Sequence, residues 1–173
     1  MKKIFVILLA MIVSVTFSCC GLDDEPTKEI NSTSPDSQMT ENNITFGLNE
    51  TAVFTNLKFT ATEIKESREE GVFEPKNGNV FVGIKFTVEN ISDEEQNISS
   101  LLLFEGYVDD VKCEYSFAAS AAFDEGTIDG SLAPGKKLVG WYPLELPEDW
   151  SKIELSVKAD WLSNKVAMFV FEK

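Results

Sequence analysis

The side chains that could most plainly do chemistry are carboxylates in two predicted loops. They are Asp109 and Asp110 at the centre of a hairpin turn, and Asp124, Glu125 and Asp129 before Pro134. If the two loops meet at one end of the domain, their oxygens could hold calcium. Their spacing matches no known calcium loop, and aspartate is common in turns because it bonds the local backbone. We therefore expect no cofactor, with calcium as the alternative.

The chain contains no histidine. This absence excludes Ser-His-Asp and Cys-His mechanisms and the usual zinc and copper ligand sets. A glycosidase would need two carboxyl groups facing each other across a cleft, and no pattern indicates a cleft. We therefore expect a protein without catalytic activity. An enzyme or a metal-dependent accessory factor is the alternative.

The N-terminus is typical of an exported protein. Two lysines precede an uncharged apolar run, Ile4–Val13, which is too short for a confident membrane span and indicates a secretion signal over residues 1–18. The end of the signal resembles the bacterial lipobox, with the small Ser18 directly before Cys19. The resemblance implies cleavage before Cys19 and a lipid on its thiol, which would hold the chain at the extracytoplasmic face of the cell membrane. A plain secretion signal cleaved nearby is the alternative.

Two further cysteines remain, Cys20 beside the predicted anchor and Cys113 in a predicted strand. They could pair in a disulfide, or Cys113 could be a buried free thiol. No histidine is present to activate a thiol, so we expect no catalytic role for Cys113.

The formal net charge is −14, from 15 basic and 29 acidic residues. An acidic surface repels phosphate backbones, so nucleic acid is not expected as a partner. Residues 19–43 are polar and lack any apolar period, which predicts a lipid anchor followed by a flexible tether. Residues 44–173 form the predicted domain, which is long enough for a core of its own.

Apolar and polar residues alternate with period two through most of this domain, which is typical of strands with one face on a core. The alternating rows are Leu57–Ala61, Val80–Val88, Leu138–Leu146, Ile153–Val157 and Val166–Val170. A denser apolar segment, 98–108, is predicted to be buried on both faces. About seven or eight short strands favour an all-β, antiparallel sandwich, with a small closed barrel as the alternative.

Turn chemistry separates the rows. Residues 108–111 read Val-Asp-Asp-Val, typical of a tight hairpin, and residues 133–136 read Ala-Pro-Gly-Lys, which suits a type II turn. We expect at most a turn or two of helix, near residues 120–125 or 148–151.

Several aromatic side chains fall on outward-facing or loop positions: Phe73, Phe81, Trp141, Trp150 and Trp161. Exposed aromatics could contact a protein or glycan partner. A register slip of one residue would place Phe81 or Trp141 in the core instead, and the core is the expected place for most of the five.

The segments 78–82, 86–90, 99–100, 115–117 and 130–135 together resemble a widespread bacterial domain of unknown function over residues 44–157. That domain occurs in lipoproteins, mostly of Gram-positive bacteria. The resemblance implies an immunoglobulin-like sandwich similar to a secreted mycobacterial antigen, and carries no catalytic residues. We therefore expect a lipid-anchored binding or envelope-support module with an unknown protein or glycan partner.

Overall fold

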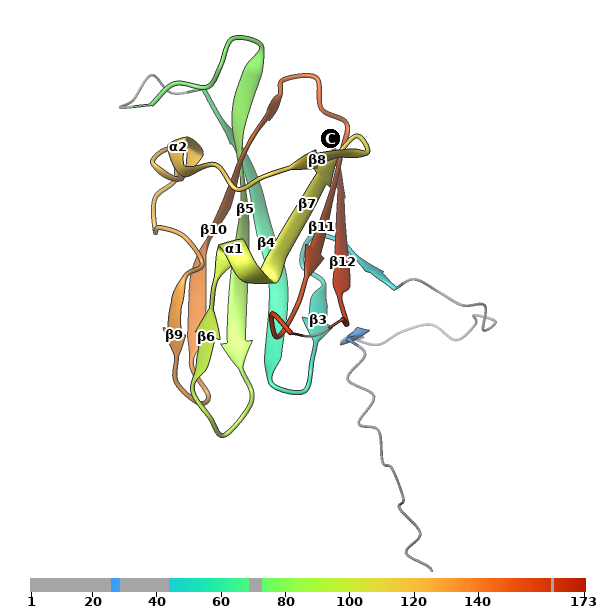
Figure 1. Cartoon of the computed structure of the whole chain (residues 1–173), viewed down its shortest axis with the longest axis vertical. Helices are drawn as coiled ribbons and strands as arrows, with labels where there is room; N and C mark the ends of the chain where they lie inside the picture. The colour runs from blue at the N-terminus through green and yellow to red at the C-terminus, as the bar shows by residue number, and fades with distance from the viewer. Residues whose placement is uncertain (1–25, 29–43, 69–72, 163) are drawn as a thin grey trace, which may run out of the picture.

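The computed structural model describes residues 26–28, 44–68, 73–162 and 164–173. These residues form two facing β-sheets with a small third sheet at one side (Figure 1). The two-sheet sandwich predicted from the alternating rows is confirmed.

The first sheet has the strand order β1-β3-β4-β5-β10 and the second β2-β12-β11-β7-β8. The bounds of the first sheet are β1 Thr27–Lys28, β3 Thr51–Val53, β4 Leu57–Ser67, β5 Asn79–Asn90 and β10 Lys137–Pro147. Those of the second are β2 Thr45–Phe46, β7 Phe104–Val108, β8 Val111–Cys113, β11 Lys152–Val157 and β12 Ala167–Glu172. The third sheet pairs β6 Gln96–Ile98 with β9 Gly130–Leu132.

The topology is that of an immunoglobulin-like domain. Strands β4, β5 and β10 are neighbours in one sheet, and β7, β11 and β12 are neighbours in the other, in the order of strands A, B, E and C, F, G. Apart from the parallel pair of β2 with β12, the strand pairs are antiparallel in the part of the chain described.

The main core lies between the two large sheets. The inward rows of β4, β5, β10 and β11 are those predicted from the alternation, and Phe59, Phe86 and Leu144 are fully buried. In β12 the inward row is Ala167, Phe169 and Phe171, while Met168 and Val170 are half-buried on the other face. Each fully buried large apolar side chain contributes about 1.5–3 kcal/mol relative to an exposed one.

A second, smaller core covers the outer face of the first sheet. Phe81 and Trp141 point to this face, as their register predicts, yet both are buried because Phe123 and Ala119 pack over them. Phe123 lies nearly parallel to the Trp141 ring, with 5.0 Å between centroids. Trp150 is also buried, whereas Phe73 and Trp161 are exposed. The expectation that most of the five aromatics lie in the core is confirmed.

Two single-turn helices are present in the described residues, α1 (Ser100–Leu103) and α2 (Phe117–Ser120). The prediction that segment 98–108 is one doubly buried strand is wrong. The segment contains the end of β6, α1 and β7, and helix α1 turns Leu101 and Leu102 toward solvent.

The two predicted turns are confirmed. Asp109 and Asp110 both have positive φ, 46° and 66°, as a type I′ hairpin requires. In the other turn the Lys136 N–H donates to the Ala133 carbonyl over 3.1 Å, and Gly135 has a φ of 69°.

Within the predicted tether, Thr27 and Lys28 form strand β1, which pairs with β3, and Lys28 forms an ion pair of 2.5 Å with Glu50. This part of the tether therefore packs on the domain. The signal, Cys19, Cys20 and residues 29–43 lie outside the described residues. None of the helices in the described ranges is long and apolar enough to cross a membrane.

Candidate functional site

The candidate site lies where the two sheets separate, between β10 and β7. After β8, residues 114–116 cross this gap as a strap, and the Ser116 N–H donates to the Pro143 carbonyl on β10 over 2.9 Å. One cavity of about 390 Å³ lies between the strap and α1. A second, of about 590 Å³, lies on the side of the strap nearer the Asp109–Asp110 hairpin. The strap and β8 therefore form a partition with a hollow on either side.

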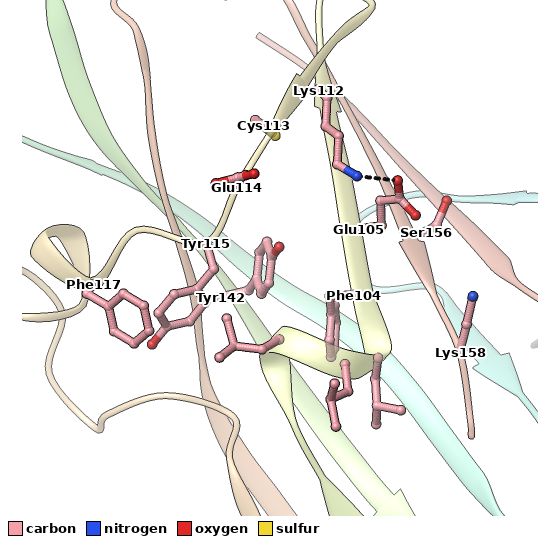
Figure 2. Close-up of a pocket in the computed structure, with 13 residues that line it drawn as sticks. Phe104, Glu105, Lys112, Cys113, Glu114, Tyr115, Phe117, Tyr142, Ser156 and Lys158 are labelled. Atoms are coloured by element: carbon pink, nitrogen blue, oxygen red, sulfur yellow. Dashed lines mark hydrogen bonds and ion pairs between the residues drawn. The ribbon is translucent and has the colours of Figure 1, made fainter. Parts of the chain in front are cut away.

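Aromatic rings line the first cavity (Figure 2). Tyr142 stacks on Phe104 with 5.1 Å between centroids, and Tyr115 meets Tyr142 edge-on at 5.8 Å. Phe117 in turn meets Tyr115 edge-on at 4.9 Å. Burial raises the pKa of both Tyr115 and Tyr142 above the ordinary value of a tyrosine hydroxyl. The series of rings leads from the buried core to the solvent-facing rim.

The rim of this cavity is apolar and exposed. Leu101, Leu102 and Phe117 are 57%, 62% and 71% exposed, although each is a large apolar residue. Helix α1 is held in place by Asp129, whose carboxylate accepts hydrogen bonds from the Ser100 N–H and hydroxyl over 2.8 and 2.9 Å. Asp129 thereby positions the two leucines.

The opposite wall is polar. Lys112 and Glu105 form an ion pair of 2.9 Å across the β7–β8 hairpin, and the Lys112 hydrogen bond lowers the pKa of Glu105. Ser156 and Lys158 complete this wall (Figure 2). The cavity can therefore receive an apolar group that carries a polar or charged end.

Residues 46–167 match the sequence family described as "Domain of unknown function (DUF4352)". The chain belongs to this family. The family match confirms the resemblance to a domain of unknown function, while similarity to a mycobacterial antigen stays a prediction. No curated protein sequence matches this DUF4352 chain.

Solved structures with the same fold come from several bacteria. A "putative lipoprotein" from Bacillus subtilis is 12% identical with a TM-score of 0.56, over 68% of this chain and 36% of that one. An uncharacterized β-sandwich protein from Clostridium difficile is 17% identical with a TM-score of 0.50, over 79% and 99%. A "putative lipoprotein" from Staphylococcus aureus is 19% identical with a TM-score of 0.50, over 70% and 87%. The DUF4352 chain spans only about a third of the Bacillus protein, and these likenesses show the fold alone.

The predicted carboxylates lie apart in the DUF4352 domain. Asp109 accepts hydrogen bonds from the Ser151 and Lys152 N–H groups over 3.1 and 2.9 Å, and from the Ser151 hydroxyl. Asp110 faces Lys152 over 3.7 Å, whereas Glu125 pairs with Lys85 over 2.5 Å.

Asp124 is exposed, and Asp129 caps α1 as described above. Throughout the ranges that the structure describes, no three acidic, histidine or cysteine side chains are grouped so that they could hold a metal ion. The five predicted carboxylates are therefore not grouped together in the described part of the chain.

Cys113 is a free, half-buried thiol on the wall between the two cavities. Its sulfur fills the space above Gly106, where an added Cβ would lie only 2.8 Å from Sγ. Burial raises the pKa of the Cys113 thiol to about 11, so the nucleophilic thiolate is scarce at neutral pH.

We expect this thiol to react slowly while the protein is folded. Raising its pKa to about 11 lowers the thiolate fraction at pH 8 about 100-fold. Alkylation by iodoacetamide, followed on the Cys113 peptide by mass spectrometry, should therefore be slower by about that factor than in the urea-unfolded chain. The difference should shrink as the pH rises through 11. Equal rates at pH 8 would contradict the assigned burial.

The rim residues were not among the predicted site residues. The apolar pattern of residues 98–108 predicts a buried strand for Leu101 and Leu102, and Phe117 belongs only to the segments of the family resemblance. The sequence feature that indicates helix α1 is Ser99-Ser100 before the leucines, since serine interrupts a strand pattern and favours the start of a helix.

Proposed function

We propose that this chain is a lipid-anchored, non-enzymatic binding module at the extracytoplasmic face of the cell membrane. The lipobox-like segment that ends at Cys19 supports the anchor. Two of the structures with the same fold are described as putative lipoproteins, which supports the same location. The absence of histidine and the raised pKa of Cys113 support a role without catalysis.

The observation that carries the binding role is the aromatic cavity with its exposed apolar rim. A leucine pair and a phenylalanine held open to water around a hollow are typical of a surface that another molecule covers. The partner we propose is a protein segment in an extended conformation.

Strand β8 supports this choice of partner. Among the described strands it lies at the edge of the second sheet, where its one partner is β7, and its Val111 is 66% exposed. A strand added at this edge would gain backbone hydrogen bonds. Its alternate side chains could then enter the cavities that flank the strap. An aliphatic rim suits apolar side chains better than the hydroxyl-rich surface of a glycan.

Photo-crosslinking in intact cells tests the proposal. A benzoylphenylalanine at position 117 of the full chain should give an adduct whose tryptic digest contains peptides of a second protein, whereas the same residue at Val139, exposed on the outer face of the first sheet, should not. Leu102→Asp should lower the adduct yield at position 117 at least about tenfold, because one buried apolar contact is lost.

Two outcomes would contradict the proposal. Equal adducts at positions 117 and 139, unaffected by Leu102→Asp, would show that the cavity is not the contact surface. An adduct whose added mass is removed by glycosidases, with no peptides of a second protein in its digest, would make the partner a glycan. Because Leu102 is 62% exposed, Leu102→Asp should fold normally, which circular dichroism can verify.

A further inference from the structure

The loop between β11 and β12 carries a second exposed apolar surface. This surface is not part of the proposed binding site. Trp161 and Leu162 are 63% and 69% exposed, whereas Trp141 and Trp150 are each 4% exposed. The Leu162 N–H donates to the Asp160 carboxylate over 3.1 Å, which shapes the turn beneath the two side chains. The loop therefore presents its apolar residues to solvent from a hydrogen-bonded turn.

This loop lies beside the place where the N-terminal chain enters the domain. Strand β2 runs parallel to β12, with Thr45 opposite Met168, so Ile44 lies next to the first residues of β12. Ile44 and Val166 are 46% and 39% exposed and extend the apolar surface at the base of the loop. Strand β1 lies in the same lower half of the molecule in Figure 1, opposite β8 and the C-terminus.

The charge of this loop differs from that of the chain as a whole. Residues 158–166 contain Lys158 and Lys165 against one acid, Asp160, although the full chain has 15 basic and 29 acidic residues. The Asp109–Asp110 hairpin lies at the other end of β11, since Val108 pairs with Ile153 and Phe104 with Val157. Acidic Asp93, Glu94 and Glu95 follow β5, in a loop at the lower end of the molecule in Figure 1. The exposed part of the loop is thus mainly apolar, since the Lys165 Nζ is buried and Lys158 lines the first cavity.

We propose that Trp161 and Leu162 dip into the interfacial region of the bilayer that holds the N-terminal lipid. Tryptophan is favoured at the membrane–water interface because its ring is apolar and its N–H finds polar partners there. This inference rests on the proposed anchor, which would keep the loop close to the bilayer, so that a small apolar contact is enough to orient the domain.

Quenching of tryptophan emission by brominated lipid tests the inference. The full chain, purified from membranes, is added to vesicles of phosphatidylglycerol and phosphatidylcholine whose acyl chains carry bromine. We expect quenching in the wild type that is lost in the variant Trp161→Phe, because the remaining tryptophans are buried inside the domain. Unchanged emission from Trp141 and Trp150 in that variant shows that the domain is still folded.

Flotation of the same samples separates this inference from the proposed anchor. A chain that floats with the vesicles without Trp161 quenching overturns the membrane contact and leaves the anchor standing. Quenching at high lipid without flotation supports the contact and overturns the anchor. A chain that neither floats nor is quenched overturns both the contact and the anchor. Quenching that is unchanged in Trp161→Phe overturns the membrane contact alone.

Discussion

Replacing Asn90 with alanine is expected to lower the free energy of unfolding by about 3–5 kcal/mol. Asn90 is fully buried at the end of β5. Its Nδ2 group donates to the Glu94 and Leu132 carbonyls over 2.7 and 2.8 Å, and its Oδ1 accepts from the Ser92 N–H and hydroxyl over 2.9 and 2.8 Å. Alanine would leave buried backbone groups without partners, which is costlier than losing the bonds alone.

Asn97→Ala is the matched control for this prediction. Asn97 is exposed, and its side chain accepts one hydrogen bond from Ser131 over 2.9 Å. Its loss should change the stability by no more than about 0.5 kcal/mol, as is usual for a surface site. Urea unfolding of both variants measures the difference. Equal midpoints would show that Asn90 does not hold the loop 91–96 to β9.

Replacing Gly140 with alanine is expected to lower the free energy of unfolding by about 3 kcal/mol through overpacking. Gly140 lies on β10 beneath residues 126–128, which cross the strand closely enough for the Trp141 N–H to donate to the Gly126 carbonyl over 2.9 Å. A Cβ on Gly140 would lie 2.6 Å from the Thr127 carbonyl carbon and oxygen. Backbone atoms cannot swing aside as a side chain can, so the crossing segment must move.

The displacement should also be visible in the fluorescence of Trp141, because the same segment follows Phe123, which covers that ring. A red shift together with an earlier urea midpoint is the expected result. Gly47→Ala is the control, since an added Cβ there would lie 3.8 Å from Glu50 Oε2, an ordinary van der Waals contact. Wild-type stability in Gly140→Ala would show that the crossing segment is loosely held.

The sandwich was predictable because its signals are local. The alternation within each row indicates which residues face the core. The Asp-Asp and Pro-Gly pairs indicate turns because these residues accept the backbone angles that the turns require. Leu57, Phe59 and Ala61 are all fully buried, as their spacing indicated. Turn residues at 109–110 and 135 take the positive φ that the predicted turns demand.

The rest depended on contacts between distant segments. The register correctly placed Phe81 and Trp141 on the outer face of the first sheet, yet only the arrival of Ala119 and Phe123 buries them. The candidate cavity likewise combines α1, the strap, β10 and β11, so the pattern of no single segment predicts it. The contacts of the carboxylates depend on distant segments in the same way, since Asp109 accepts from the Lys152 N–H and Asp129 from the Ser100 N–H.

The short strands through which the chain enters the domain have a mechanical consequence. Within the described residues, β1 and β2 are each paired over two residues, whereas β4, β5 and β10 are paired along their length. If the N-terminus is anchored as proposed, tension on the cell surface would act first on these two short pairings. They would separate from the sheets before the force acted on the core strands. The domain could therefore lose these two strands while its cavity kept its shape.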